Sequence, residues 1–161
     1  MNVVDAIGYF EFVRDIPFRI PLSPGEPHHH CGGKHVVLKT LLSSLGLVVR
    51  YAPCRFSWNS LNIPESLKQI PHEDVANHVY LEVYNQEQSR WMTVDATWDR
   101  GLASRLPVSE WDGRSDTTLA VKPTESLKPI ESQEEFDKLF ADNHDGEFGE
   151  ALNKWLESIR T

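Results

Sequence analysis

Apolar residues recur at helical spacing in two segments near the start of the 161-residue chain. Residues 3–14 carry apolar side chains every three or four positions, which predicts a first helix. Residues 34–45 repeat this pattern and predict a second, buried helix that Gly46 ends. The intervening stretch "IPFRIPLSPGEP" contains Pro17, Pro21, Pro24 and Pro27. Because these prolines exclude a regular helix, we expect an extended, irregular segment between the two helices.

The middle of the chain has the composition and alternation of strands. "LVVRYAPC" (47–54) is rich in β-branched residues and predicts a strand that enters the core. Residues 59–75 are expected to form a loop that holds a single turn of helix. "NHVYLEVY" (77–84) alternates cleanly, and "WMTVDATW" (91–98) follows after the polar, turn-like "NQEQSR". These two segments predict an antiparallel hairpin.

The last third of the chain ends in amphipathic segments. The stretch "RSDTTLAVKPTESLKP" (114–129) is interpreted as irregular, and helical patterns follow at 134–141 and 148–159. The second pattern places one apolar stripe on its helix: Phe148, Leu152, Trp155, Leu156 and Ile159. This stripe predicts either a cover for the sheet or, if it is exposed, a surface for self-association. Helices followed by strands and then by terminal helices indicate an α+β chain and not alternating βαβ units.

Composition and charge narrow the function classes. The chain is long enough to bury a core, and 40% of its residues are hydrophobic. Its net charge of −8 argues against nucleic acid as a partner, since phosphate binding requires a basic surface. We find no signal-peptide pattern and no run near the roughly 18 apolar residues of a membrane span. With two cysteines and no disulfide framework, the protein is expected in the cytoplasm with reduced thiols.

Cys31 has an unusual sequence environment, with three histidines before it and two glycines after it. A metal site built from His28–His30, Cys31 and His35 is one interpretation, but no CxxC or HxxxH pattern completes a tetrahedral set. A buried structural thiol is another, and it fits Cys54 better because Cys54 lies inside a strand pattern. A helix N-terminus has unpaired N–H groups and about half a positive charge, which favours thiolate over thiol. We therefore expect Cys31 to be a nucleophile, with the two glycines leaving room for a substrate backbone.

His78 and Asp95 supply the partners that a thiol nucleophile needs. His78 begins the first strand of the predicted hairpin and Asp95 ends the second, so both lie at the end opposite the turn. They are expected at directly or diagonally opposed positions, within side-chain reach. Asp95 then accepts a hydrogen bond from one imidazole nitrogen and orients the ring, which leaves the other nitrogen to face Cys31. Taken separately, either residue is more simply a solvated strand end.

Three blocks of the sequence resemble the transglutaminase-like superfamily. They are "CGGKHVVLKTLLSSLGLVVR", "NHVYLEVY" and "RWMTVDATWD", in the order of the family pattern. The matching residues are Cys31, Lys34, Leu41, Leu42, Leu45, Gly46 and Arg50 in the first block, His78, Glu82, Val83 and Tyr84 in the second, and Trp91, Val94, Asp95 and Thr97 in the third. "YFEFVRDIPF" also looks like the helix that precedes the cysteine in such proteins.

The resemblance implies a fold. It is a papain-like α+β fold in which the Cys31 helix packs on an antiparallel sheet that carries His78 and Asp95. The whole chain, 1–161, is then a single transglutaminase-like domain with its core at about residues 5–100 and a C-terminal helical cover at 123–161.

The resemblance also implies acyl transfer through a thioester, with no cofactor and no metal. The substrate is an amide or ester carbonyl of a peptide, a protein or a small amide. Water as the acceptor gives a peptidase or amidase, an amine gives a transglutaminase, and the small size of the chain favours hydrolysis. Arylamine acetyltransferases share the order of Cys, His and Asp, but their arginine- and glycine-rich approach to the cysteine is absent.

Departures from the family pattern keep a second interpretation open. His30 precedes Cys31 where the family often has a small or neutral residue, and no glutamine occurs before Gln69 to donate to an oxyanion. The Cys31 N–H then has to serve together with a second donor. The rival interpretation is a catalytically inactive transglutaminase-like module for binding or scaffolding. Beyond the triad, Trp58 and Tyr51 are candidates for the wall of a substrate site, and Asp99 is interpreted as a turn residue.

Overall fold

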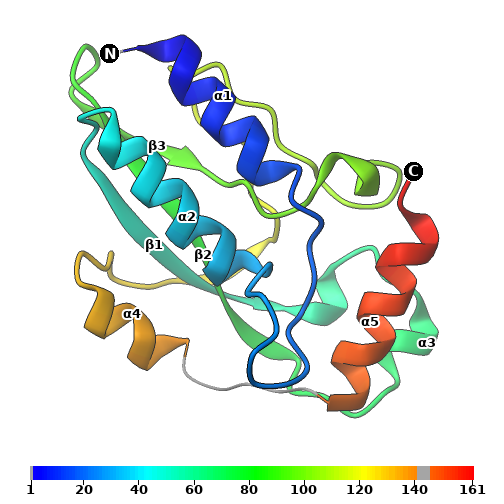
Figure 1. The fold of residues 1–161 in the computed structure, drawn as a ribbon. Coiled ribbons are helices and arrows are strands. Elements are labelled where there is room, and N and C mark those ends of the chain that lie inside the picture. The colour runs from blue at the N-terminus through cyan, green and yellow to red at the C-terminus, as the bar shows by residue number, and fades with distance from the viewer. Residues whose placement is uncertain (1, 141–145) are drawn as a thin grey trace.

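The structure of the protein is a computed structural model that describes residues 2–140 and 146–161 (Figure 1). Within these residues five α-helices accompany a four-stranded antiparallel sheet that curls into a half-barrel, which confirms the α+β class. None of the helices in this part of the chain has the length and hydropathy that a membrane crossing requires.

Both N-terminal helices form where the apolar spacing predicts them. Helix α1 spans Val3–Arg14, and the side chain of Asn2 accepts the N–H of Asp5 at its start. Helix α2 spans Cys31–Ser44, so it begins three residues earlier than the apolar pattern indicates. Gly46 follows α2 with a φ of +83°, the left-handed conformation that glycine adopts at helix ends. The two helices lie side by side over one face of the sheet (Figure 1).

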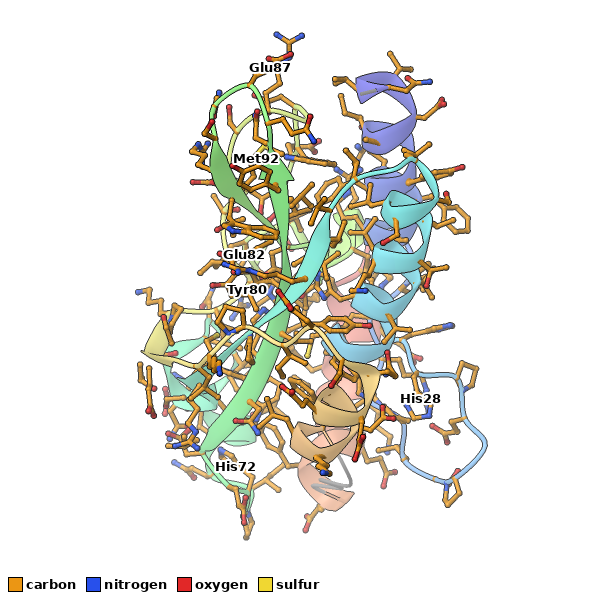
Figure 2. The ribbon with its side chains drawn as sticks, turned by 90° about the vertical axis from the view of Figure 1, so that its left-hand side faces the viewer. His28, His72, Tyr80, Glu82, Glu87 and Met92 are labelled. Atoms are coloured by element: carbon orange, nitrogen blue, oxygen red, sulfur yellow. The ribbon has the colours of Figure 1, made fainter. Side chains whose placement is uncertain are left out.

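The strands pair in the order β3-β2-β1-β4. They span Val49–Ser57 (β1), Val75–Asn85 (β2), Arg90–Val94 (β3) and Pro123–Ser126 (β4). The predicted hairpin is β2–β3, in antiparallel register with Leu81 opposite Val94. Figure 2 shows its tip at Glu87 at one end of the molecule, with His72, shortly before β2, at the other.

The expectation of irregular structure through 114–129 is wrong at β4. Its four residues are all exposed and lack apolar alternation, so the sequence carries no strand signal there. The strand exists because its backbone pairs with the end of β1, near Cys54 and Arg55. The loop expected at 59–75 does contain short helices, a 3-10 turn at Trp58–Ser60 and helix α3 at Glu65–Lys68.

Two apolar clusters hold the elements together. The first lies between α1, α2 and the sheet and includes Val79, Leu81 and Val83, which are fully buried as their alternation predicts. The second includes Cys54 and Phe56 of β1 together with residues of the C-terminal helix.

The C-terminal helices act as a cover. Helix α4 spans Gln133–Leu139, and the last residue of the pattern predicted at 134–141 lies outside the described residues. Helix α5 spans Gly146–Ile159 and lies beside α3 (Figure 1). Its stripe is packed into the second cluster, with Phe148, Leu152 and Leu156 buried. The stripe therefore covers the core and does not form an exposed surface.

Candidate active site

Cys31 is the first residue of α2 and is partly exposed. His30 caps this helix: its Nδ1 accepts the N–H of Gly33 at 3.0 Å, and its carbonyl accepts the N–H of Lys34 at 3.0 Å. Burial lowers the pKa of His30, which keeps the ring neutral and able to accept. In the described residues no backbone carbonyl or side chain accepts a hydrogen bond from the N–H of Cys31, which leaves this group free to donate to a ligand.

The two glycines after Cys31 have different reasons to lack a side chain. A Cβ on Gly33 would lie 1.7 Å from the carbonyl oxygen of His28, so the absent side chain of Gly33 leaves room for the backbone of His28. The expectation that it makes room for a substrate is therefore wrong. Gly32 does line the cavity beside Cys31, where an added Cβ would lie 3.1 Å from the ring of His30.

His78 and Asp95 are hydrogen-bonded to each other, as the hairpin predicts. The distance from His78 Nε2 to Asp95 Oδ2 is 2.9 Å, and both side chains are buried. Strand β3 ends at Val94, and one further step in its register would place Asp95 opposite Tyr80, diagonal to His78. The contact is thus the diagonal one of the two expected positions.

Several donors besides His78 hold the Asp95 carboxylate. Thr97 donates to Oδ1 through its backbone N–H at 3.1 Å and through its hydroxyl at 2.6 Å. The N–H of Ala120 donates to Oδ2 at 2.9 Å. Burial alone would raise the pKa of Asp95, but the charge and hydrogen bond of His78 outweigh it and hold this pKa well below its usual range. Asp95 is therefore a fixed negative charge.

This charge sets the protonation state of His78. Burial acts to lower the pKa of His78, but the Asp95 carboxylate overcomes it and raises the pKa to about 10. The side chain of Cys31 adds a smaller effect in the same direction. His78 is thus an imidazolium at neutral pH. Its Nε2 is taken by Asp95, which leaves Nδ1 for a second partner.

Cys31 and His78 line the same cavity, which has a volume of about 180 Å³. The described residues contain no well-formed hydrogen bond between the two side chains. The cavity also takes in His28 and His30 from the loop before α2, which Figure 2 places toward the His72 end of the molecule. Of the two residues suggested for a substrate wall, Trp58 lines the cavity, whereas Tyr51 packs on Phe136 in the first cluster.

His35 is a site residue that the sequence suggested only as a metal ligand. Its Nδ1 donates to the carbonyl of Cys31 at 2.8 Å, and its Nε2 accepts the N–H of Ala96 at 2.9 Å. Burial lowers the pKa of His35 to about 4, so the ring is neutral and both nitrogens are used. His35 thereby ties the first turn of α2 to the residue after Asp95. The spacing of four residues from Cys31 was the available signal.

Lys34 makes a second tie between the same segments. Its buried ammonium donates to the carbonyl oxygens of Arg14 at 2.8 Å, Ile16 at 2.8 Å and Thr97 at 2.7 Å. The three acceptors match the three N–H bonds of an ammonium group. The end of α1, the start of α2 and the chain beyond Asp95 are therefore fixed to one another at the back of the site.

Cys54 and Asp99, the other two residues singled out in the sequence, have structural roles. Cys54 is fully buried opposite His78, and burial raises its pKa to about 12, as a structural thiol requires. Asp99 is not a simple turn residue: it is buried, accepts the N–H of Phe18 at 2.8 Å and binds Arg160 through both oxygens. Over residues 2–140 and 146–161, no three His, Cys, Asp or Glu side chains are grouped so as to hold a metal ion.

The fold and the site define an α+β protein with a cysteine at a helix start and a buried His–Asp pair on a hairpin. Comparison of the chain with protein-family models, with curated proteins and with solved structures gave no match. The resemblance to the transglutaminase-like superfamily therefore stays a prediction that rests on the residues of the three blocks.

Proposed function

We propose that the protein is a cysteine-dependent acyl-transfer enzyme with a papain-like, transglutaminase-like fold. Cys31 is the nucleophile, His78 transfers protons, and Asp95 orients His78 and keeps it charged. The observation that supports this proposal most is the buried pair of His78 and Asp95. Asp95 leaves Nδ1 of His78 free, and His78 lines the same cavity as Cys31. Cys31 lies at the N-terminus of a helix.

The first half of the reaction forms a thioester. The Cys31 sulfur attacks the carbonyl carbon of an amide or ester, and the carbonyl oxygen takes up the negative charge. The N–H of Cys31 donates to that oxygen. As the bond from carbon to the leaving group breaks, His78 gives its proton to the leaving nitrogen or oxygen.

The second half returns the site to its starting state. Water or an amine attacks the thioester carbon and gives a proton to His78, the carbon–sulfur bond breaks, and the thiolate is restored. The high pKa of His78 supports this cycle, because the ring already holds a proton before the substrate arrives.

The alternative is a module that keeps the fold without the chemistry. Two observations favour it: Cys31 and His78 are not joined by a well-formed hydrogen bond, and the sequence has no glutamine before Cys31 that could donate to an oxyanion. Both interpretations place a cleft at Cys31. They differ in the reactivity of its sulfur.

Alkylation with iodoacetamide at neutral pH separates the two interpretations. We expect wild-type protein and Cys54→Ala to take up one label each, at least about 10-fold faster than a free cysteine, as an activated thiolate does. Cys31→Ala should take up none. In Asp95→Asn the pKa of His78 should fall towards its ordinary range, which an NMR titration of the ring follows, and labelling should slow. Labelling at the rate of free cysteine in both wild type and Asp95→Asn would support the inactive module and overturn the proposal.

A further inference from the structure

The cavity at Cys31 has an apolar wall built by segments that are distant in the sequence. The apolar residues that line it include Phe18, Phe56, Trp58, Ala76, Trp98 and Val121. The lining residues in the described part of the chain include no Asp, Glu, Lys or Arg. The charged side chain among these lining residues is the His78 imidazolium, and it is already paired with the Asp95 carboxylate. A charged group entering the cavity would therefore lose its water without gaining an unpaired partner of opposite charge from these residues.

Hydrogen bonds and aromatic contacts fix this wall in place. The rings of Phe18 and Trp98 lie 4.6 Å apart between centroids, and those of Phe56 and Trp58 lie 4.9 Å apart. The indole N–H of Trp98 donates to the carbonyl of Ala120 at 2.9 Å. Because each ring is held by a neighbour, the cavity is formed before a ligand arrives.

The volume of the cavity limits what fits inside it. At about 180 Å³ it is slightly larger than the engineered cavity of about 150 Å³ that binds benzene in another protein. It is smaller than the pockets of about 300–1,000 Å³ that enclose drug-sized ligands. One aromatic ring or one branched aliphatic side chain fills such a space.

We infer that the acyl donor carries an uncharged apolar side chain of ring or branched-aliphatic size next to the carbonyl that Cys31 attacks. This inference rests on the proposed function, since the cavity holds Cys31 and His78 together with the apolar wall. It assigns the site to hydrophobic acyl groups, and it places acidic and basic side chains outside the preferred class.

A series of activated esters with one common leaving group tests the side-chain preference. N-acetyl amino-acid p-nitrophenyl esters of Phe, Leu, Gly, Glu, Lys and Gln are compared by the rate of nitrophenolate release and by the mass of the acylated protein. In each case the bond from the carbonyl carbon to the Cys31 sulfur forms and nitrophenolate leaves. We expect Phe and Leu esters to react about 10- to 100-fold faster than Gly, the factor that burial of one such side chain provides. We expect the Glu and Lys esters to gain nothing over Gly, and the Gln ester to react more slowly than the Phe and Leu esters.

Two neighbouring variants show whether the cavity causes the preference. Ala76→Phe fills the cavity and should bring the Phe and Leu rates down to that of Gly. Val75→Phe, at the preceding residue of β2, is the matched control, because Val75 is 58% exposed and is not among the residues that line the cavity. It should keep the preference. Thermal unfolding of both proteins verifies that they fold.

Failure of this inference can be told apart from failure of the proposed function. If Cys31 is acylated at equal rates by all the esters, the enzyme stands and the apolar class is overturned. Binding of N-acetyl-phenylalanine amide and N-acetyl-glutamate amide to Cys31→Ala protein, followed by ligand-observed NMR, needs no reaction. Binding of only the Phe compound, with no acylation by any ester, would overturn the enzyme and uphold the apolar class. Equal binding of both compounds would overturn the apolar class.

Discussion

His35 uses both ring nitrogens inside the protein, and this makes stability depend on pH. Its pKa is about 4 in the folded chain and about 6.5 in an unfolded one. Between these values the unfolded chain binds more protons than the folded chain, so the free energy of unfolding falls as the pH is lowered from 6.5 to 4. The full shift corresponds to roughly 3 kcal/mol.

We predict that His35→Phe removes this pH dependence. At pH 7 the variant leaves the N–H of Ala96 and the carbonyl of Cys31 without partners, which should cost about 1–3 kcal/mol. Towards pH 4 the difference from wild type should shrink, because only the wild type is penalised by protonation. Urea unfolding at several pH values measures both effects. His29→Gln, at a half-buried histidine whose side chain makes no hydrogen bond within the described residues, is the control, and a constant difference across the pH range would contradict the role of His35.

Sequence patterns located part of the candidate site. The contact of His78 with Asp95 follows from strand alternation and hairpin register, and the position of Cys31 follows from where a helix can begin. The roles of Lys34 and Asp99 could not be predicted in this way. Their partners lie far away in the sequence, at Thr97 and Arg160, and only the folded chain brings them together.

At the scale of elements, the start of α2 depends on Gly33, because any other residue at this position would displace the neighbouring backbone. The carbonyl of His28 occupies the place of a side chain at Gly33. We predict that Gly33→Ala destabilises the protein by about 3 kcal/mol or more and displaces the histidine loop that precedes Cys31. Urea unfolding and the rate of Cys31 alkylation measure the two effects.

Gly8 in α1 provides the matched comparison. No atom lies within 4 Å of the position of its Cβ, so Gly8→Ala should raise the free energy of unfolding by up to about 1 kcal/mol through helix propensity. Equal stability of the Gly33→Ala variant and wild type would mean that His28 does not pack against α2 as described.

The elements themselves differed in how far the sequence specified them. Helix 148–159 and the hairpin carry strong periodic patterns, and helix 3–14 carries a weaker one. The predicted places of all three are confirmed to within a few residues. Strand β4 carries no pattern because all its side chains are exposed and only its backbone pairs. The apolar pattern of α2 begins at residue 34 and not at Cys31, because the first turn of this helix contains two glycines, which are poor helix formers and carry no apolar side chain.

On the scale of the whole molecule, the C-terminal helix holds the wall of the cavity. The side-chain amide of Asn153 accepts the N–H of Ile20 and donates to its carbonyl, both at 2.9 Å. Arg160 donates to the carbonyl of Phe18 at 3.1 Å. The proline-rich segment thus receives from α5 and the residues after it the hydrogen bonds that a neighbouring strand would otherwise supply.

We predict that Asn153→Ala lowers the free energy of unfolding by about 1–3 kcal/mol, because it leaves two backbone groups of Ile20 without partners. The proline-rich segment at 17–27 should also be cleaved faster in limited proteolysis. Lys154→Ala, which removes an exposed pair with Glu150, should change stability by no more than about 0.5 kcal/mol. Unchanged cleavage of the segment in Asn153→Ala would contradict the anchoring role of α5.

The burial of Cys54 has a practical consequence. A fluorophore carried on a maleimide can reach only one sulfur in the native chain, so the unmutated protein becomes a single-colour probe with one dye per molecule at the mouth of its own cavity. A compound that enters the cavity then changes the fluorescence emission of the dye, so its binding can be detected without an assay for turnover.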